Sequence, residues 1–441
     1  MTMKRKKQVN SLWTAEDERV HSSSTLEWWA VIGFFTSKEN QKHWSIKATL
    51  SEGVIDPAHY GSVCNIAVFD EDTKHQYVYV NRKLDSPLNS RQDVFEVNFD
   101  DSSMNGAYPF YEVRLQDPVN DIEIDITLHA ESLPYQVGQE ATDGWLPMGL
   151  GIFRYGFIPK MRISGTMKIQ GTYVTIEGTG YFEHIWGNIS FRNPVVPRKN
   201  LMKTISIYTR LLVWWLQHQK PSLPSSLMWS TENNPLGYDW AWALLDNGWM
   251  LFYGNVLSWI MEGPATGVLI LSKDGKTFTE FGAITFRYIK TKFAHHYDFL
   301  YPTELEITAL HEHETLHLRF TMTEECREYI SQFSNRKYWL GFVTCEAPGT
   351  VMGYYMNEKE KIPLSGKCKI EPQRQVSIIG HNSLRIDLLK PPRGIGISLE
   401  IDSHYLKKKV TVHLQLVPQL TLRFNCKRIE ASREAMRKTR N

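Results

Sequence analysis

The chain has 441 residues, of which 42% are hydrophobic and 22% charged, so it can form more than one domain with a sizeable core. Its formal net charge is only +2, and no basic-aromatic module accompanies the charged ends, which disfavours nucleic acid as a partner. The five cysteines are widely spaced and fit neither a disulfide framework nor a zinc knuckle. No signal peptide and no membrane-spanning helix is expected, so a cytoplasmic protein is the interpretation.

Residues 1–20 are polar and are predicted to form a flexible N-terminus. From residue 21 the chain shows β patterns, with turn signals about every 8–15 residues. The clearest alternation lies at 121–128, where four aliphatic residues point one way and polar residues the other. This pattern predicts an antiparallel barrel or sandwich over residues 21–190.

The stretch 178–188 reads as a strand that ends in a turn, because aromatic residues fill it and glycines bound it. Period-two alternation puts Phe182, His184 and Trp186 on one face. Glu183 lies on the other face, between Tyr181 and Ile185. An imidazole beside an indole on an inward face is either a buried histidine with one hydrogen-bond partner or part of a functional site.

Residues 191–230 break the β pattern, and prolines bound them at both ends. Apolar side chains at 201, 205, 208, 212 and 215 follow helical spacing and predict one amphipathic helix over 201–216. The helix either packs between two domains or caps a barrel end, or it acts as a lid or a membrane-surface anchor. Trp214 and Trp215 suit an interfacial anchor, so peripheral membrane contact through this segment is an alternative.

Residues 231–428 are predicted to form a second β domain with extra C-terminal strands, followed by a basic tail at 429–441. In the strand that starts at Tyr238, alternation places Trp240 and Trp242 on the face of Tyr238, and Asp239 on the other face. Two alanines share the face of Asp239, so it either faces a ligand cavity as a proton donor, or caps a turn or pairs with a surface arginine.

Three histidines at 311, 313 and 317 would share one face of a continuous strand, which is a spacing that metal sites use. No fourth ligand is evident, so an exposed polar strand face is the interpretation. Neither a phosphate-binding loop nor a dinucleotide motif is present. We therefore expect no metal and no cofactor.

Four stretches together resemble the hydroxyneurosporene synthase family, which comprises carotenoid 1,2-hydratase-like, AttH-like and lipocalin-like proteins. They occur in the family's order and cover about residues 20 to 378. They are Leu26–Trp29, Gly180–Gly187, Tyr238–Trp242 with the following Asp-Asn-Gly turn, and Cys345–Gly349 through Gly366. The resemblance implies an all-β fold with two lipocalin-like antiparallel barrel or sandwich domains, separated here by the helical insertion.

The resemblance also implies the chemistry of alkene hydration, in which an acid protonates an alkene and water adds to the carbocation. Asp239 would be the acid, His184 would orient it or activate water, and Tyr238 would lie near it. Two positions depart from the family pattern. Glu183 replaces the family's aspartate before the histidine, and Tyr238 directly precedes Asp239, so a strand places the two on opposite faces.

Aromatic side chains and one carboxylate from the same motifs are predicted to line the substrate cavity, which we expect near the domain junction because both strong motifs flank the insertion. These candidates are Trp186, Phe182, Glu27, Trp29, Trp240 and Trp242. The resulting prediction is an enzyme that hydrates, cyclises or isomerises an apolar isoprenoid or polyene. The alternative is a non-catalytic carrier of a lipid or another hydrophobic ligand.

Overall fold

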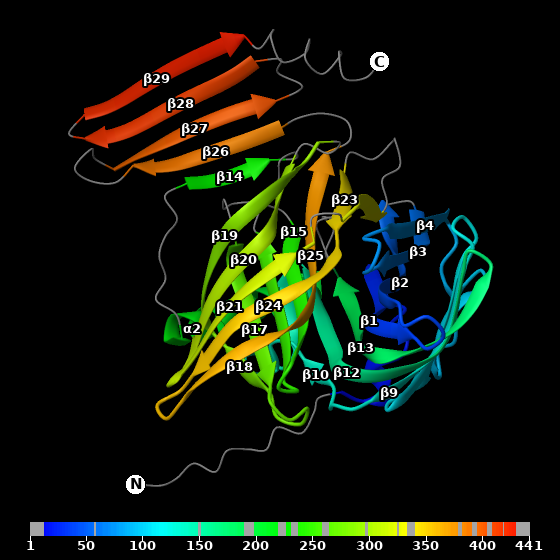
Figure 1. The fold of residues 1–441 in the computed structure, drawn as a ribbon. Helices are drawn as coiled ribbons and strands as arrows, with labels where there is room; N and C mark the ends of the chain where they lie inside the picture. Colours follow the sequence, from blue (N-terminus) through cyan, green and yellow to red (C-terminus); the bar gives the residue numbers. More distant parts are fainter. Residues whose placement is uncertain are drawn as a thin grey trace.

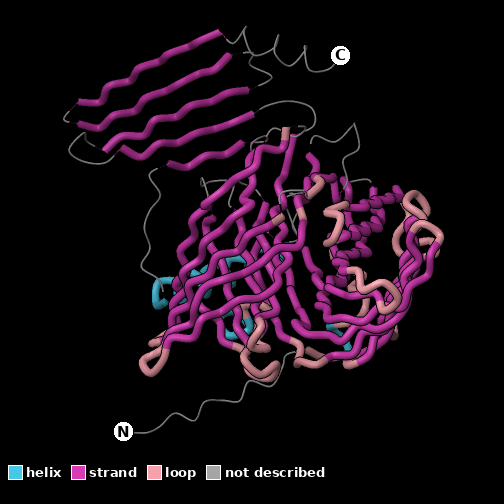
Figure 2. The backbone as a smooth tube through the Cα atoms, viewed as in Figure 1, coloured by secondary structure: helices cyan, strands magenta, loops and turns pink. Residues whose placement is uncertain are grey.

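The computed structural model describes most of the chain, and almost all of its regular structure is antiparallel β (Figures 1 and 2). Two large sheets curl into half-barrels that stand side by side. This confirms the predicted all-β class with two lipocalin-like domains. The described residues are 13–56, 59–148, 151–188, 198–218, 226–230, 237–257, 264–295, 299–323, 326–332, 340–377, 382–389, 395–403, 408–417 and 419–428.

The first sheet has the strand order β4-β3-β2-β1-β13-β12-β9-β8-β7-β6-β5, with β10 and β11 paired to β12. Its two longest strands, β12 and β13, form a hairpin whose turn, Gln170-Gly171, has positive φ at both residues, as a tight two-residue turn requires. The strands are β1 Leu26–Ser37, β2 His43–Asp56, β3 His59–Asp70, β4 Gln76–Leu84, β5 Asn89–Ser90, β6 Phe95–Phe99, β7 Ser102–Ala107, β8 Phe110–Asp117, β9 Ile122–Ala130, β10 Tyr135–Gln136, β11 Trp145–Met148, β12 Gly151–Ile169 and β13 Thr172–Asn188.

The second sheet has the order β18-β17-β16-β15-β25-β24-β21-β20-β19, and β22 and β23 extend it beside β25. Its strands are β15 Gly237–Leu245, β16 Met250–Leu257, β17 Pro264–Ser272, β18 Thr279–Phe281, β19 Ala283–Ala294, β20 Phe299–His311, β21 Glu314–Met322, β22 Glu328–Gln332, β23 Leu340–Cys345, β24 Ala347–Met356 and β25 Lys361–Ser377.

The C-terminal strands do not continue the second sheet. They pair instead with β14, which comes from the segment 191–230, and the five strands form a third sheet in the order β14-β26-β27-β28-β29 (Figure 1). Hydrophobic alternation predicted these strands, but it carries no information about which strand each one pairs with. The strands are β14 Ser226–Ser230, β26 Asn382–Leu389, β27 Ile395–Ser403, β28 Lys408–Val417 and β29 Gln419–Arg428.

The two large sheets meet through a layer of aromatic side chains. Phe157 of β12 stacks on Phe252 of β16 with ring centroids 4.6 Å apart, and Tyr181 of β13 contacts the edge of Trp240 at 5.4 Å. The indole of Trp242 donates a 2.9 Å hydrogen bond to the carbonyl of Pro159 in the first sheet. Each sheet also encloses its own apolar core, so β15 and the C-terminal half of β13 are largely buried on both faces.

Helix α2 spans Arg198–His218, which confirms the predicted helix. Among the helix side chains whose burial is described, Thr204 and Ile207 are buried, whereas Ile205 and Tyr208 of the predicted apolar stripe are 48% and 46% exposed. The helix contacts the first sheet region through a cation–π interaction, in which the Lys203 ammonium lies 3.6 Å from the centroid of the Trp145 ring. No helix in the described part of the chain is long and apolar enough to span a bilayer, and membrane contact through 201–216 stays a prediction.

A buried carboxyl also ties the two sheets together. Glu280 of β18 accepts hydrogen bonds from the Tyr135 hydroxyl at 2.9 Å and from the backbone amide of Gly138 at 3.0 Å. Gly138 precedes the short helix α1, Gln139–Thr142, of the first sheet region. Burial, with the nearby charge of Glu140, raises the pKa of Glu280 to about 7.

We expect the Glu280→Gln variant to flatten the pH dependence of stability. The native pKa lies above the ordinary value near 4.5, so the folded state binds the extra proton between about pH 4.5 and 7. The free energy of unfolding should therefore fall by about 3 kcal/mol as the pH rises through that window. In Glu280→Gln the amide oxygen still accepts both hydrogen bonds, and this part of the pH dependence should disappear.

Denaturant titrations at pH 5 and pH 8 measure the difference. The exposed Glu112→Gln variant serves as the control and should keep the wild-type dependence. An identical pH dependence in wild type and Glu280→Gln would contradict the assignment of this proton to Glu280.

Candidate functional site

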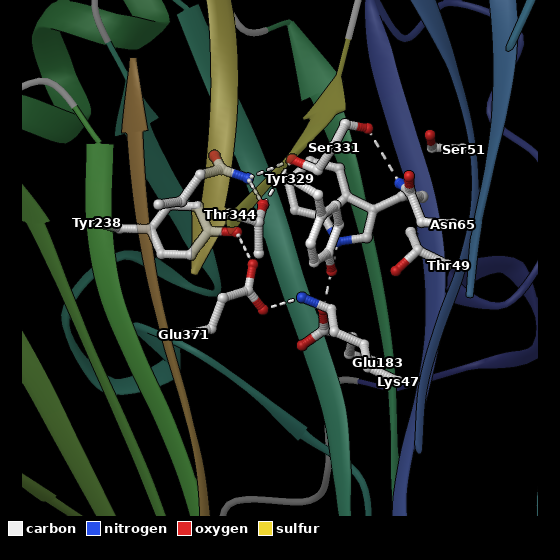
Figure 3. A pocket seen from close by; sticks show the side chains of 12 residues that line it. Lys47, Thr49, Ser51, Asn65, Glu183, Tyr238, Tyr329, Ser331, Thr344 and Glu371 are labelled. Atoms are coloured by element: carbon white, nitrogen blue, oxygen red, sulfur yellow. Dashed lines mark hydrogen bonds and ion pairs between the residues drawn. The ribbon is translucent and has the colours of Figure 1, made fainter. Parts of the chain in front are cut away.

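A small polar pocket lies at the junction of the two large sheets (Figure 3). Its volume of about 30 Å³ has room for one or two water molecules. The pocket does not have room for a polyene chain. Its lining residues are Trp28, Lys47, Thr49, Ser51, Asn65, Glu183, Tyr238, Tyr329, Ser331, Thr344, Glu371 and Gln373.

Glu183 is the carboxyl that β13 contributes to this pocket. Its carboxylate accepts hydrogen bonds from the hydroxyls of Tyr155 and Tyr181, the latter at 2.9 Å, and from the indole of Trp28 at 3.2 Å. Burial raises the pKa of Glu183 above its usual value, although these hydrogen bonds and the charge of Lys47 oppose the shift. A carboxyl in such surroundings can hold a proton at a pH where an exposed glutamate has lost it.

Lys47 of β2 lies beside Glu183 in the first sheet and forms an ion pair with Glu371 of β25 in the second sheet (Figure 3). The hydroxyl of Tyr238 donates a 2.7 Å hydrogen bond to Glu371. Burial lowers the pKa of the Lys47 ammonium. The pocket thus combines a proton donor, a carboxylate and a cation, which can hold a water molecule in a fixed orientation.

The charges of this junction do not balance if every group is ionised. A second buried ion pair joins Lys369 to Glu346 at 2.6 Å and interacts with Lys47. Three carboxylates, Glu183, Glu346 and Glu371, then face two ammonium groups, which leaves one excess negative charge in a buried region. A proton on Glu183 removes this charge, because a buried charge without a counterion is costly.

His184 projects from the opposite face of β13 into the interior of the first sheet. Its ring lies between those of Trp29 and Trp186, with centroid distances of 4.5 and 4.6 Å. Nε2 lies 2.9 Å from Oε1 of Glu27, and Nδ1 lies 2.6 Å from the backbone carbonyl of Asp17. Four residues predicted for the site, Glu27, Trp29, His184 and Trp186, therefore come together in one cluster, apart from the junction pocket.

His21 completes this cluster, although the sequence patterns did not single it out. Its Nδ1 lies 2.8 Å from Oε1 of Glu27, and its ring stacks on Trp186 at 4.4 Å. Its backbone amide donates to both carboxylate oxygens at 3.0 and 2.9 Å. Burial would raise the pKa of Glu27, but the hydrogen bonds from His184 and His21 outweigh it and hold the pKa below its usual value.

Asp239 faces the interior of the second sheet, away from both of these groups. It forms a 2.8 Å ion pair with Arg374 and accepts hydrogen bonds from Asn255 at 3.0 Å and from the hydroxyl of Tyr288. Both members of the ion pair are buried. Of the three predicted catalytic residues only Tyr238 lines the junction pocket, because alternation along β15 directs Tyr238 and Asp239 to opposite faces.

The remaining predicted side chains pack in apolar surroundings. Phe182 stacks on Tyr111 at 4.6 Å in the first core, and Trp240 and Trp242 belong to the aromatic layer between the sheets. Lys47 and Glu371 were missed. Their strands carry polar residues at every second position, 45 to 51 in β2 and 369 to 373 in β25, and this pattern is the signal that could have found them.

The histidines at 311, 313 and 317 do not converge. Residues 312 and 313 form the turn between β20 and β21, and Glu312 has a φ of 50° there. His313 lies 3.3 Å from Glu358, and His317 stacks on Tyr354. Among the described residues, the group whose side-chain atoms could together hold a metal ion is His21, Glu27 and His184.

Comparison with solved structures places this fold beside two known proteins. A protein assigned as an AttH from Nitrosomonas europaea matches with a TM-score of 0.53 and 16% identity, over 82% of this chain and 97% of that one. Kievitone hydratase from Nectria haematococca matches with a TM-score of 0.54 and 12% identity, over 81% and 92%. The fold is shared with these two proteins. No family model and no curated protein matches the sequence.

We expect the Arg374→Met variant to lose about 3–5 kcal/mol of stability, because it leaves the buried Asp239 carboxylate without its counterion. Denaturant unfolding measures the loss. Arg287→Met is the matched control, since Arg287 is 69% exposed in its pair with Glu306 and should contribute less than about 1 kcal/mol. Equal small effects of both substitutions would show that Asp239 does not depend on Arg374.

Proposed function

We propose that this protein is an enzyme of the hydratase type, which adds water to an alkene of an apolar isoprenoid or polyene at the junction pocket. The observation that carries the proposal is the buried carboxyl of Glu183, with its raised pKa, beside Lys47 and opposite Glu371 in one pocket. Alkene hydration needs an acid that is protonated near neutral pH and a water molecule held beside it. The fold that this chain shares with kievitone hydratase agrees with such chemistry.

In the proposed reaction Glu183 donates its proton to one alkene carbon, and the other carbon becomes a cation. Water held in the pocket adds to this cation and passes a proton to Glu371, which already accepts a hydrogen bond from Tyr238. Transfer of that proton to Glu183 through solvent restores the starting state. The sum is one alkene and one water converted to one alcohol.

The pocket volume sets a condition on this reaction. A space for one or two waters does not admit a prenyl group, so side chains at the junction must move apart when the substrate binds. The lining is also strongly polar. A pocket of this kind suits the reacting end of a molecule better than it suits the storage of a lipid.

We expect Glu183→Gln to lower turnover by about 10²–10⁴-fold, because the amide cannot donate the proton. The assay incubates the full chain with linear isoprenoids and polyenes, and mass spectrometry detects products that gain one water. Activity of the wild type should fall as the pH rises through the raised pKa of Glu183, because the reaction needs its protonated form.

Two further variants sharpen this test. Glu123→Gln, at a partly exposed carboxyl on β9, is the control and should keep full turnover. Asp239→Asn examines the role that the family resemblance implies. Loss of turnover in Asp239→Asn with full activity in Glu183→Gln would transfer the acid role to Asp239. Stoichiometric lipid in an organic extract of the protein, with no turnover of any substrate, would favour a carrier.

A further inference from the structure

We propose that His21, Glu27 and His184 form a binding site for a divalent transition-metal ion of the zinc type. Each residue brings one imidazole nitrogen or carboxylate oxygen to a common point, with all three atoms within 4.8 Å of one another. The cluster lies on the opposite face of β13 from the junction pocket. The inference is therefore independent of the function proposed for that pocket.

The hydrogen bonds of His184 show why a cation fits here. Nδ1 faces the carbonyl of Asp17, which can only accept a hydrogen bond, so Nδ1 carries the proton. In the neutral ring Nε2 then turns its lone pair toward Oε1 of Glu27, 2.9 Å away. Two acceptors at this distance need a positive charge between them, which either a proton on Nε2 or a metal ion supplies. A backbone carbonyl behind the ligand is the usual way to orient a metal-bound imidazole.

His21 adds the third ligand and the access route. Its Nδ1 lies 2.8 Å from the same carboxylate oxygen, and two histidines with one glutamate are a ligand set of zinc sites that keep a further position for water. The side chain of His21 is 25% exposed, whereas those of Glu27 and His184 are fully buried. Solvent and ions therefore reach the cluster from the His21 side.

The packing around the cluster determines which of the three side chains can move when a metal ion binds. Tetrahedral zinc with bonds of about 2.1 Å separates its ligand atoms by about 3.4 Å, so the donors must move apart by about half an ångström. The rings of Trp29 and Trp186 hold the plane of His184 between them. His21 stacks on the ring of Trp186 and belongs to a loop, so its side chain can rotate away from Glu27, and the Glu27 carboxylate must turn to lengthen its distance to His184.

Metal titration of the full chain tests the site. Protein stripped with a chelator should take up one Zn²⁺ per chain, with a higher thermal midpoint. Co²⁺ in its place should give the visible absorption bands of a cobalt site with nitrogen and oxygen ligands. His21→Ala should lose this uptake, and so should His21→Gln, which keeps more of the side-chain volume. His317→Ala, on β21, is the matched control and should bind as the wild type does.

Three outcomes would overturn the proposal. One is a wild-type protein that retains no Zn²⁺ or Co²⁺ after gel filtration. Another is equal uptake by the wild type and both His21 variants. The third is a nitrogen NMR spectrum that shows both ring nitrogens of His184 protonated and unchanged by Zn²⁺, because a proton would then occupy the position assigned to the metal.

Discussion

The structure depends on one constraint, which is that the C-terminal half of β13 is buried on both faces. Residues 181–187 are all buried, so each alternate side chain must find a partner in a different layer. Tyr181 and Glu183 face the second sheet, and His184 faces the interior of the first. A slip of one residue in the register of β13 would move a carboxylate into an apolar core. The hydrogen bonds of Glu183 and His184 therefore also specify the register.

The junction between the sheets combines two kinds of contact that act differently. The aromatic layer around Phe157 and Trp242 supplies apolar burial, which holds the sheets together without strict geometry. The ionic groups beside it, such as Lys47 with Glu371, contribute less net stability because desolvation offsets their attraction. They instead fix which residues oppose one another. The ionic groups therefore surround a small polar pocket inside an otherwise apolar interface. A polar pocket of this kind can bind a water molecule that takes part in a reaction.

The sequence predicted the strands and their faces well, because alternation along 178–188 and 238–242 has a single physical cause. It could not predict what each face meets. The polar side of β2, with Lys47 and Thr49, has the pattern of a solvated face, yet it lines a buried junction. His21 follows no periodic pattern, and only the path of the chain before β1 brings it to Glu27. The sequence patterns did not predict the third sheet, because the pairing of β14 with β26 joins segments that are far apart in the chain.

Glu183 and His184 are consecutive residues, and this adjacency links the two candidate sites. The backbone between them is held from one side by the contacts of His184 with Glu27 and the Asp17 carbonyl. It is held from the other side by the contacts of Glu183 with Tyr155 and Tyr181. Whatever fixes the imidazole, a metal ion or a proton, also fixes the backbone that aims the carboxyl into the pocket. The contacts of the buried histidine thus help to hold the backbone at Glu183, although the imidazole itself lies on the other face of the strand.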